Sequence, residues 1–294
     1  MHAKVTIIIL NWNGKKDTIE CVESVRNLSY PNYEILIVDN GSTDGSQEAF
    51  RQKYPDITLI ENPKNLGFAE GNNIGMRYAL KSGSDYILLL NNDTTVDQIF
   101  LDELIKWAEM DEKVGILGPK IYFYHEPKRI WFLGANINLW TGRISYIGRN
   151  QIDRGQFEDI KEVDYVAGCA ILVKREVIEK IGLLDKRYFF YYEDTDWCAR
   201  AKKAGYSVIF VPEAKIWHKI GASSGKIEGF SLYYSMRNRF LFMKKHSTEI
   251  QFLSFLIYFV SVNTLLIITY LIFKQRNPKL LKTFYKGIYD GITS

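Results

Sequence analysis

The 294-residue sequence is poor in cysteine. It has three cysteines, Cys21, Cys169 and Cys198, which lie far apart and form no Cys-x-x-Cys pair. A disulfide scaffold and a cysteine zinc site are therefore not indicated, and a reducing compartment fits best. A secretory signal is also not expected, because the apolar run at residues 5–10 is too short and no small-residue cleavage site follows it.

The sequence also lacks a strong charge of one sign. Its 38 Lys and Arg against 34 Asp and Glu leave a formal net charge of +4, which does not call for a nucleic-acid partner. With 7 Pro and 21 Gly among 47% hydrophobic residues, a collagen-like, low-complexity or disordered chain is excluded. The mean hydropathy of −0.15 is that of a soluble protein, but an average can hide one very apolar segment.

Short apolar runs alternate with helix-length segments over the first 120 residues. The runs are residues 5–10, 34–39, 57–61, 86–91 and 114–118, and the intervening helices are expected at 15–27, 44–53, 68–82 and 97–110. Continuous apolarity indicates strands that are buried on both faces, as in a parallel sheet. The alternation therefore predicts a doubly wound α/β sheet.

The second part of the chain is less regular. Residues 121–164 show no periodicity and are interpreted as short strands with a variable loop. A strand is expected at 165–173, a helix at 175–181 and a further strand at 207–211.

Polar residues cluster where the first strands end. The clusters are Asn11-Trp12-Asn13-Gly14, Asp39-Asn40-Gly41-Ser42, residues 62–67 and Asn91-Asn92-Asp93. Ligands of open α/β sheets bind at the carboxyl ends of strands, so these clusters predict one site. The alternative is that each cluster makes an ordinary Asx turn.

Two of these carboxylates suit particular ligands. Asp39 could accept a hydrogen bond from a base N–H or a ribose hydroxyl, or it could simply hold the turn into the next helix. Asp93, beside a diphosphate, could hold Mg²⁺ or Mn²⁺, which take oxygen ligands; the alternative is again a turn.

An acidic segment, Glu193 to Trp197, follows five consecutive aromatic residues. Desolvation by aromatic rings would raise the pKa of a carboxyl group and make it a better base. Alternatively, the acids only complement the dipole of the helix that begins there. His218 could be a metal ligand or phosphate contact, or a structural histidine.

Taken together, these runs resemble glycosyltransferase family 2, of the GT-A fold, and within it the rhamnosyltransferase-like subgroup. The matching runs are residues 6–14, 37–45, 65–75, 88–93, 168–173 and 192–197, His218 with Gly221 and Ser223, and Arg237-Asn238-Arg239. They occur in the family's order over residues 4–245. The resemblance implies an α/β fold with a GT-A, Rossmann-like mixed sheet flanked by helices.

The resemblance also implies a role for each matching residue. The nucleotide-sugar would be bound by Asn11, Asn13, Gly14, Asp39 at the base, Asn40, Asn65 and Gly67 near the ribose, and Asn92. Asp93 and His218 would hold Mg²⁺ or Mn²⁺, Asp194 would be the catalytic base, and Glu193, Asp196 and Trp197 would contact the acceptor or support the site. The family's Asp-x-Asp metal motif begins here with Asn91, which leaves Asp93 as the main anchor.

The implied activity is an inverting, divalent-metal-dependent transfer of a hexosyl or deoxyhexosyl group. The donor would be a nucleoside-diphosphate sugar and the acceptor a hydroxyl of a glycan or lipid-linked molecule, in cell-surface polysaccharide synthesis. An alternative is a non-catalytic nucleotide-sugar-binding scaffold of a membrane glycan-assembly complex, although Asp93 and Asp194 speak against it. A nucleotidyltransferase would need a Gly-rich phosphate loop, which residues 11–16 match poorly.

The end of the chain differs from the rest. Residues 252–273 contain no charge and, as a helix, would measure about 33 Å, close to the thickness of a bilayer core. Residues 274–294 have the apolar spacing of an interfacial amphipathic helix. Residues 230–294 hold nine Lys or Arg against Glu249 and Asp290. A buried helix pair or an oligomer interface is the alternative.

From these patterns we expect a glycosyltransferase domain over residues 1–245 and C-terminal helices over 246–294. The domain would divide into a nucleotide-sugar half, residues 1–120, and an acceptor half, residues 121–245. Residues 252–289 would associate with the cytoplasmic side of the cell membrane, either peripherally or as a single span. Oligomers are possible, and no nucleic-acid partner is expected.

Overall fold

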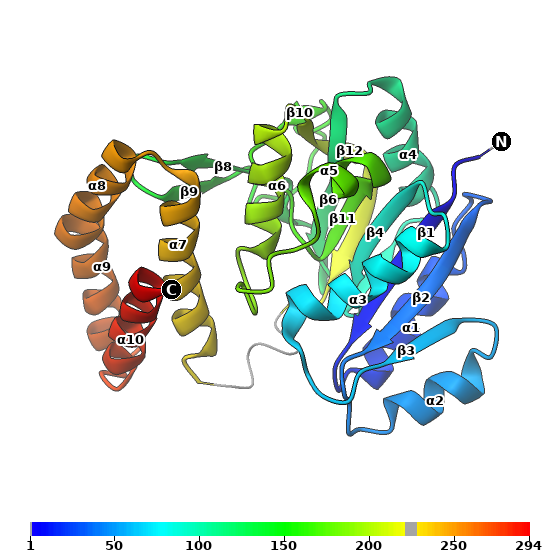
Figure 1. Ribbon diagram of the computed structural model, residues 1–294, viewed down its shortest axis with the longest axis horizontal. Helices are drawn as coiled ribbons and strands as arrows, with labels where there is room; N and C mark the ends of the chain where they lie inside the picture. Colours follow the sequence, from blue (N-terminus) through cyan, green and yellow to red (C-terminus); the bar gives the residue numbers. More distant parts are fainter. Residues whose placement is uncertain (1, 221–227) are drawn as a thin grey trace. The chain divides into compact units, whose positions relative to one another are not determined.

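The computed structural model describes residues 2–220 and 228–294 (Figure 1). Gly221 and Ser223, which belong to one of the matching runs, lie outside the described residues. The described chain forms two compact units. The first contains residues 2–135, 146–189 and 193–220, and the second contains residues 136–145, 190–192 and 228–294.

The first unit begins with alternating strands and helices. In chain order these are β1 (Val5–Asn11), α1 (Lys15–Val25), β2 (Tyr33–Asp39), α2 (Ser46–Lys53), β3 (Thr58–Glu61), α3 (Gly67–Lys81) and β4 (Tyr86–Asn91). β1 pairs in parallel with β2 and β4, and β2 pairs in parallel with β3. All residues of β1 except Leu10 are buried, as a strand covered on both faces requires.

The rest of the first unit extends the same sheet. Its elements are β5 (Thr94–Val96), α4 (Phe100–Met110), β6 (Val114–Phe123), β7 (Glu126–Phe132), β10 (Lys161–Glu162), β11 (Ala170–Lys174), α5 (Arg175–Ile181), α6 (Glu193–Lys203) and β12 (Ser207–His218). The strand order is β10-β12-β6-β11-β4-β1-β2-β3, and β11 runs antiparallel to both of its neighbours. Helix α3 contacts β1 and β2, and helices α4 and α6 contact β6 and β12. The predicted mixed sheet flanked by helices is confirmed (Figure 1).

Three predicted strands have clearly different bounds in the structure. The strand expected at 114–118 continues to Phe123 as β6. The strand expected at 165–173 is shortened to β11, because Gly168 donates its backbone N–H to the Asp194 side chain and Ala170 donates to Ala167. The strand expected at 207–211 continues to His218. Its pairing with β6 shifts register between Val211 and Lys215, around Pro212, which has no N–H to donate. Because of that interruption, the sequence pattern did not predict the part of β12 after Pro212.

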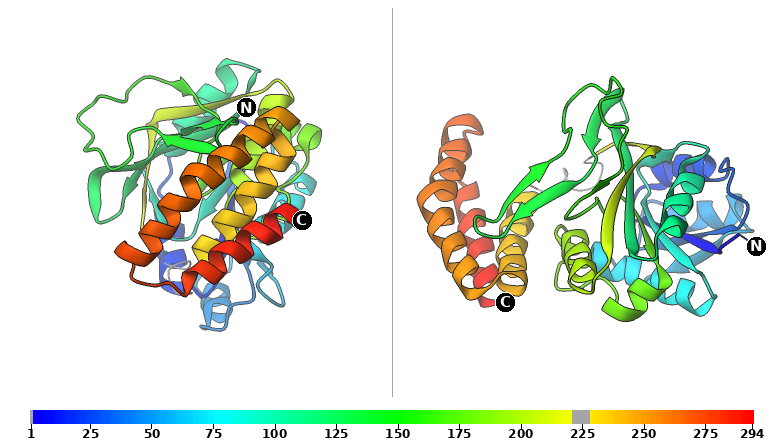
Figure 2. Two further views of the ribbon diagram at one scale, coloured as in Figure 1. Left: turned by 90° about the vertical axis from the view of Figure 1, so that its left-hand side faces the viewer. Right: turned by 90° about the horizontal axis from the view of Figure 1, so that it is seen from above.

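The second unit consists of helices and the tip of a hairpin. The hairpin strands are β8 (Ala135–Asn138) and β9 (Arg143–Tyr146), and the helices are α7 (Phe230–His246), α8 (Glu249–Tyr258), α9 (Thr264–Thr269) and α10 (Leu280–Thr293). Five-residue π-helical segments, Phe259–Asn263 and Tyr270–Lys274, continue α8 and α9 into one helix, Glu249–Lys274. Both views of Figure 2 show α7, this long helix and α10 side by side.

The helix Glu249–Lys274 is long and apolar enough to cross a membrane, with a mean hydropathy of 2.2 over its most apolar window. Only 17% of that window is buried within the described chain, so the rest of this unit leaves most of the helix surface uncovered. The expected domain boundary after residue 245 stays a prediction.

Candidate active site

Asn11 connects the ends of three neighbouring strands. It is the last residue of β1 and is fully buried. Its amide nitrogen donates to Asp39 Oδ2 (2.7 Å) and Ser42 Oγ (3.0 Å). Its amide oxygen accepts from Thr18 Oγ1 (2.8 Å) and Asn92 Nδ2 (3.1 Å). The structure therefore brings together the carboxyl ends of β1, β2 and β4.

Asp39 is enclosed within this network. Besides Asn11, it accepts hydrogen bonds from the Ser42 backbone N–H (2.9 Å) and from Gln47 Nε2 (2.7 Å). Its side chain is fully buried, so in this structure it holds the turn that follows β2. Its contact with a base stays a prediction.

Asn13 and Gly14 form the turn after β1. Asn13 adopts the left-handed conformation (φ 51°), which asparagine tolerates better than most residues. Its side-chain oxygen accepts from the Thr43 N–H (2.7 Å), and its own N–H donates to Ser42 Oγ (2.9 Å). The Gly14 N–H donates to Asn11 Oδ1 (3.2 Å). The turns after β1 and β2 are thus bonded to each other.

Asn40 fixes the loop that precedes α3. Its amide nitrogen donates to Asn65 Oδ1 (3.0 Å) and to the Gly67 carbonyl (3.1 Å). Gly67 has a φ of 82°, and an ideal Cβ there would stand 2.5 Å from a ring carbon of Phe189. This position therefore requires glycine, and Asn40, Asn65 and Gly67 lie together. Their contact with a nucleotide-sugar stays a prediction.

Asp93 and His218 meet although 125 residues separate them. β5 pairs antiparallel with the end of β12, which places His218 opposite Thr94. His218 Nε2 lies 3.0 Å from Asp93 Oδ1. Burial would raise the pKa of Asp93, but the hydrogen bond and charge of His218 outweigh burial and lower it. Burial likewise disfavours protonated His218, but Cys169 and Asp93 outweigh burial and raise its pKa.

This pair fits a hard divalent cation as a partial ligand set. No group of three or more His, Cys, Asp and Glu gathers among residues 2–220 and 228–294. Asp93 supplies carboxylate oxygens, and His218 Nε2 is the ring nitrogen that lies beside them. Mg²⁺ and related ions are commonly held by one or two carboxylates, with waters and substrate phosphates completing the shell. Asp93 is therefore suited as the anchor and His218 as its companion.

Asp194 lies in the first turn of α6 and is partly exposed. Its Oδ2 accepts from the Gly168 N–H (2.9 Å), and its Oδ1 accepts from the Thr195 N–H (2.6 Å). Burial raises the pKa of Asp194 and outweighs these hydrogen bonds. A carboxylate with a raised pKa, fixed by backbone groups and still accessible, can act as a proton acceptor.

Glu193, beside Asp194 in the chain, is buried. Its Oε2 has no hydrogen-bond partner. Burial, with the charge of Asp194 as a second cause, raises the pKa of Glu193 well above its usual range. Glu193 is therefore a carboxyl group that favours its protonated form next to the candidate base.

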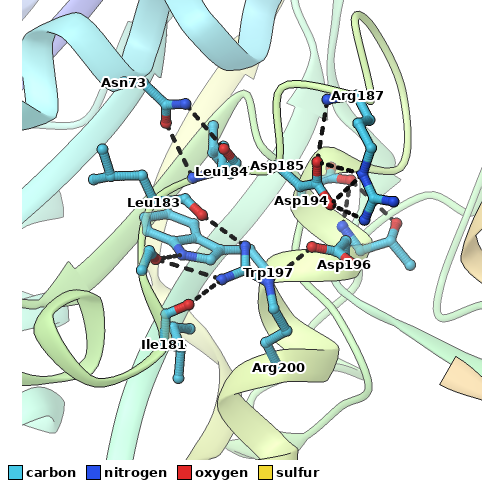
Figure 3. A network of polar contacts seen from close by, with 12 residues as sticks. Asn73, Ile181, Leu183, Leu184, Asp185, Arg187, Asp194, Asp196, Trp197 and Arg200 are labelled. Atoms are coloured by element: carbon cyan, nitrogen blue, oxygen red, sulfur yellow. Dashed lines mark hydrogen bonds and ion pairs between the residues drawn. The ribbon is translucent and has the colours of Figure 1, made fainter. Parts of the chain in front are cut away.

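Asp196 and Trp197 face the interior of the first unit (Figure 3). Asp196 Oδ2 accepts from Arg200 Nε (2.8 Å), and Trp197 Nε1 donates to the Gly182 carbonyl (2.9 Å). Arg200 also donates to the carbonyls of residues 181 and 183. Trp197 directly, and Asp196 through Arg200, thus connect α6 to the loop after α5. Both side chains are fully buried, so this arrangement supports the site and exposes neither to a substrate.

Sequence reasoning missed Thr18 and Lys219. The Thr18 hydroxyl bonds to Asn11 and accepts from Asn92 Nδ2 (2.9 Å), and only its place in the first turn of the helix after an Asn-rich turn could have indicated it. Lys219 Nζ contacts Asp17 (2.6 Å) and Glu20 (2.7 Å). These acids balance a cation that adjoins His218.

Comparison with known proteins gives the family. The sequence model described as "Glycosyl transferase family 2" matches residues 6–182. The chain is 27% identical to the dTDP-rhamnosyl transferase RfbF of Shigella flexneri, over 99% of this chain and 96% of that protein. It is 28% identical to an N-acetylglucosaminyl-diphospho-decaprenol L-rhamnosyltransferase of Mycobacterium tuberculosis, over 72% of this chain and 75% of that protein.

Solved structures agree on the fold. The mannosyltransferase PcManGT of Pyrobaculum calidifontis, in complex with GDP-Man and Mn²⁺, aligns with a TM-score of 0.62 at 14% identity, over 99% of this chain and 88% of that one. GalNAc-T7 with UDP, GalNAc and Mn²⁺ aligns with a TM-score of 0.60 at 14% identity, over 91% of this chain and 57% of that one.

The predicted GT-A fold and the resemblance drawn from the motifs are both confirmed. The chain belongs to glycosyl transferase family 2 as a rhamnosyltransferase-like member, and it is a glycosyltransferase of glycan synthesis.

Proposed function

We propose that this enzyme transfers a sugar, with inversion, from a nucleoside-diphosphate sugar to a hydroxyl of a glycan or lipid-linked acceptor. The observation that carries the proposal is the setting of Asp194. Its carboxylate is held by the N–H groups of Gly168 and Thr195, has a raised pKa and remains partly exposed. Those are the properties of a general base for an acceptor hydroxyl.

The donor would occupy the edge of the sheet formed by the ends of β1, β2 and β4. Asn11, Asn13, Gly14, Asp39, Asn40, Asn65, Gly67 and Asn92 line or brace this edge. A deoxythymidine-diphosphate sugar with rhamnose is the donor that the name of the Shigella relative supports, and the name of the Mycobacterium relative supports the L form of that sugar. The network of side-chain amides around Asn11 would keep the pocket rigid when the nucleotide arrives.

In the reaction, Asp194 takes the proton of the acceptor hydroxyl. The acceptor oxygen then bonds to the anomeric carbon while the bond from that carbon to the diphosphate oxygen breaks on the opposite face, which inverts the anomeric centre. Mg²⁺ or Mn²⁺, held by Asp93 with His218, would stabilise the charge that develops on the leaving diphosphate. Two structural neighbours were solved with Mn²⁺, which supports this cofactor.

The test replaces the base without changing its shape. Asp194→Asn should lower kcat by about 10²- to 10⁴-fold, the usual contribution of a general base. Calorimetric binding of dTDP-L-rhamnose with Mn²⁺ should stay within threefold of the parent. Asp159→Asn, at an exposed acid of the same unit, is the matched control and should leave kcat unchanged. Unchanged turnover in Asp194→Asn would reject the assignment of the base.

The same binding and transfer measurements distinguish the enzyme from the alternative, a non-catalytic scaffold. A scaffold would bind the nucleotide-sugar and transfer nothing to any glycan or lipid-linked acceptor in a panel. Inversion is checked on the product by the anomeric coupling of the new linkage in NMR. A retained configuration would exclude the single displacement.

We also propose that the second unit associates with the cytoplasmic side of the cell membrane. The largely unburied apolar helix Glu249–Lys274 and the excess of cations over residues 230–294 support this. The Mycobacterium relative is named for a decaprenol-linked acceptor, and a lipid-linked acceptor would make this location useful. After cell lysis, the full-length protein should sediment with membranes and be released by detergent. A protein that stays in the soluble fraction without detergent would reject the proposal.

A further inference from the structure

The helix Glu249–Lys274 has two different faces. Phe255, Phe259 and Leu271 are buried against the rest of the second unit. Large apolar side chains on the other face are exposed, with Val260 at 70% and Phe273 at 75%. The further members of this apolar face are Ile250, Leu253, Ile257, Leu265 and Leu266.

The buried face is packed against two helices that carry charges. The ring of Phe240 on α7 lies 5.1 Å from that of Phe255 and 4.8 Å from that of Phe259, and Phe259 stacks on Phe284 of α10 at 6.3 Å. The guanidinium of Arg239 lies 5.5 Å from the centre of the Phe255 ring. Through these contacts the long helix packs against α7 and α10 within the second unit.

Helices α7 and α10 are also in close backbone contact. An ideal Cβ on Gly287 would stand 2.8 Å from the Tyr233 carbonyl oxygen, and one on Gly291 would stand 2.4 Å from that of Arg237. Two glycines four residues apart therefore let α10 lie directly on α7. Neither partner helix can be separated from the unit without exposing these surfaces.

This packing argues against a transmembrane span. If the long helix crossed a bilayer, α7 and α10 would enter the hydrocarbon beside it. Helix α7 carries Arg237, Arg239, Lys244 and Lys245, and α10 carries Lys282, Lys286 and Asp290. Charged side chains are strongly disfavoured at the centre of a bilayer. A helix lying along the surface buries the same apolar face and leaves these charges in water.

The exposed cations at the end of the long helix and after it complement anionic headgroups. Exposed cations follow the long helix at Lys274, Arg276, Lys279, Lys282 and Lys286. Exposed tyrosines, Tyr270, Tyr285 and Tyr289, suit the boundary between headgroups and acyl chains. Cationic and apolar faces on one helical unit are the pattern of interfacial binding.

We propose that the helix Glu249–Lys274 lies in the plane of one anionic membrane leaflet and does not cross it. Its apolar face enters the acyl region, and the charged positions of α7 and α10 remain at the level of headgroups and water. This inference rests on the membrane association proposed above, and it specifies the geometry and the lipid chemistry.

The topology is tested by the two ends of the helix in the full-length protein. Glu249→Cys and Lys274→Cys introduce single reactive thiols, and the parent, whose three cysteines are buried, is the blank. An impermeant maleimide is applied to intact spheroplasts and to inside-out vesicles of cells that produce each variant. Both ends should react in the inside-out vesicles and neither in spheroplasts. Reaction of the two ends from opposite sides would overturn the proposal and leave membrane association intact.

The lipid chemistry is tested with purified full-length protein and vesicles. Binding to vesicles with 30% phosphatidylglycerol should exceed binding to phosphatidylcholine vesicles at least tenfold and weaken as salt is raised. The double variant Ile257→Asp with Val260→Asp should lower binding at least tenfold, whereas Met110→Asp, at an exposed apolar residue of the first unit, should not. Equal binding to both vesicles would overturn the anionic preference. No binding by the parent would overturn membrane association itself, while sugar transfer to a water-soluble acceptor remains a separate measurement.

A second, independent inference concerns Asn238, a residue of the matching run Arg237-Asn238-Arg239. Asn238 is fully buried on α7. Its amide nitrogen donates to the carbonyls of Phe190 and Tyr191, each at 2.8 Å. Those carbonyls belong to the segment 190–192, which leads directly into Glu193 and Asp194 along the chain.

The segment 190–192 has a conformation that needs external support. Tyr191 and Tyr192 have φ values of 69° and 71°, in the left-handed region that residues other than glycine seldom adopt. The ring of Phe242 contacts Tyr192 at 5.7 Å, and the ring of Phe230 contacts Phe190 at 5.5 Å. These rings pack against side chains, whereas Asn238 holds the backbone itself.

We infer that Asn238 is a positioning residue for the transfer reaction. By holding the carbonyls of Phe190 and Tyr191, it restrains the backbone that leads along the chain into Glu193 and Asp194. The inference rests on Asp194 being the base.

The decisive variant is Asn238→Asp, which keeps the size of the side chain but removes the donors to both carbonyls. We expect kcat to fall 10- to 100-fold, with the donor KM changed less than threefold. Asn238→Ala should behave similarly, and Asn238→Gln should restore part of the rate. Ser231→Ala removes the contact of Ser231 Oγ with the Tyr191 hydroxyl (3.2 Å) and is the control, with kcat unchanged.

A readout without substrate accompanies these rates. Amide hydrogen exchange at residues 190–194 should accelerate in Asn238→Asp while exchange in the strands of the sheet stays the same. A folded Asn238→Asp protein with kcat within twofold of the parent would overturn the inference. Parallel losses of kcat, donor affinity and melting temperature would also overturn it, because they indicate a structural role alone. Absence of transfer by the parent would instead reject the proposed function.

Discussion

Replacing Glu193 by glutamine should make the protein more stable at neutral pH. Glu193 is buried, and its Oε2 lacks a hydrogen-bond partner. Its pKa is raised well above the ordinary range, mainly by burial and further by Asp194. Ionised Glu193 therefore costs free energy in the folded state that it does not cost in the unfolded chain. The substitution Glu193→Gln keeps the shape of the side chain without the charge.

The size of the effect follows from proton linkage. Between the unfolded pKa of about 4.3 and the raised folded pKa, the folded state keeps a proton that the unfolded state has lost. The free energy of unfolding contributed by Glu193 therefore falls by about 1.4 kcal/mol for each pH unit as pH rises through that window. The Glu193→Gln variant lacks this pH dependence, so its free energy of unfolding rises relative to that of the parent as pH increases.

Urea unfolding of the parent and Glu193→Gln at pH 5, 6, 7 and 8 measures this difference. The advantage of the variant should be smallest at pH 5 and increase steadily until the folded pKa is passed. Glu109→Gln, at an exposed glutamate of α4, is the control and should show no such trend. A constant difference between parent and Glu193→Gln at all four pH values, or a variant that loses stability as pH rises, would refute this reasoning.

Three further substitutions test the arrangement of the site. Asp93→Asn should weaken calorimetric Mn²⁺ binding, in the presence of dTDP, by at least tenfold, and unaltered binding would remove Asp93 from the metal site. Gly67→Ala should lower the free energy of unfolding by about 1–3 kcal/mol for a strained left-handed alanine, beyond any cost of displacing Phe189; a neutral change in urea unfolding would contradict this. Arg200→Met should cost about 3–5 kcal/mol in the same assay, because it removes the guanidinium that is paired with the buried Asp196 carboxylate. The loss should shrink when Asp196→Asn is added.

The clustering of polar residues at strand ends could be predicted from the sequence because parallel strands end at one edge. Asn11, Asp39 and Asn92 follow three such strands, and the structure bonds them to one another. What the sequence could not indicate is which of them would be exposed. Asp39 collects three donors and is enclosed, an outcome that depends on Gln47 in the next helix.

The pairing of Asp93 with His218 could not be derived from the sequence without the family resemblance. It depends on β5, a three-residue strand in a stretch that resembles a turn, and on the part of β12 after Pro212. Neither β5 nor the part of β12 after Pro212 shows a strong periodic pattern of apolar residues in the sequence. Local patterns report on neighbours along the chain, and this contact joins residues 125 positions apart.

For the C-terminal helices, too, one part of the structure could be predicted from the sequence and another could not. The length and apolarity of the helix were evident from residues 252–273, but these properties fit a span and a surface helix equally well. The proposal of a surface helix rests on tertiary contacts of Phe255 and Phe259 with the charged helix α7. A hydropathy profile contains no information about such partners.

The inner position of β12, between β10 and β6, has a consequence for where the chain can be cut. The match to the family model ends at residue 182, yet β12 lies between β10 and β6 inside the sheet, and both Asp194 and His218 follow that boundary. A fragment cut where the family model ends would lose an inner strand, the candidate base and one half of the candidate metal pair. During synthesis the ribosome must likewise release residue 218 before β12 can pair with β5 and bring His218 to Asp93. The family model therefore marks only the first part of the chain, whereas similarity to the Shigella relative continues over 99% of it and includes β12, Asp194 and His218.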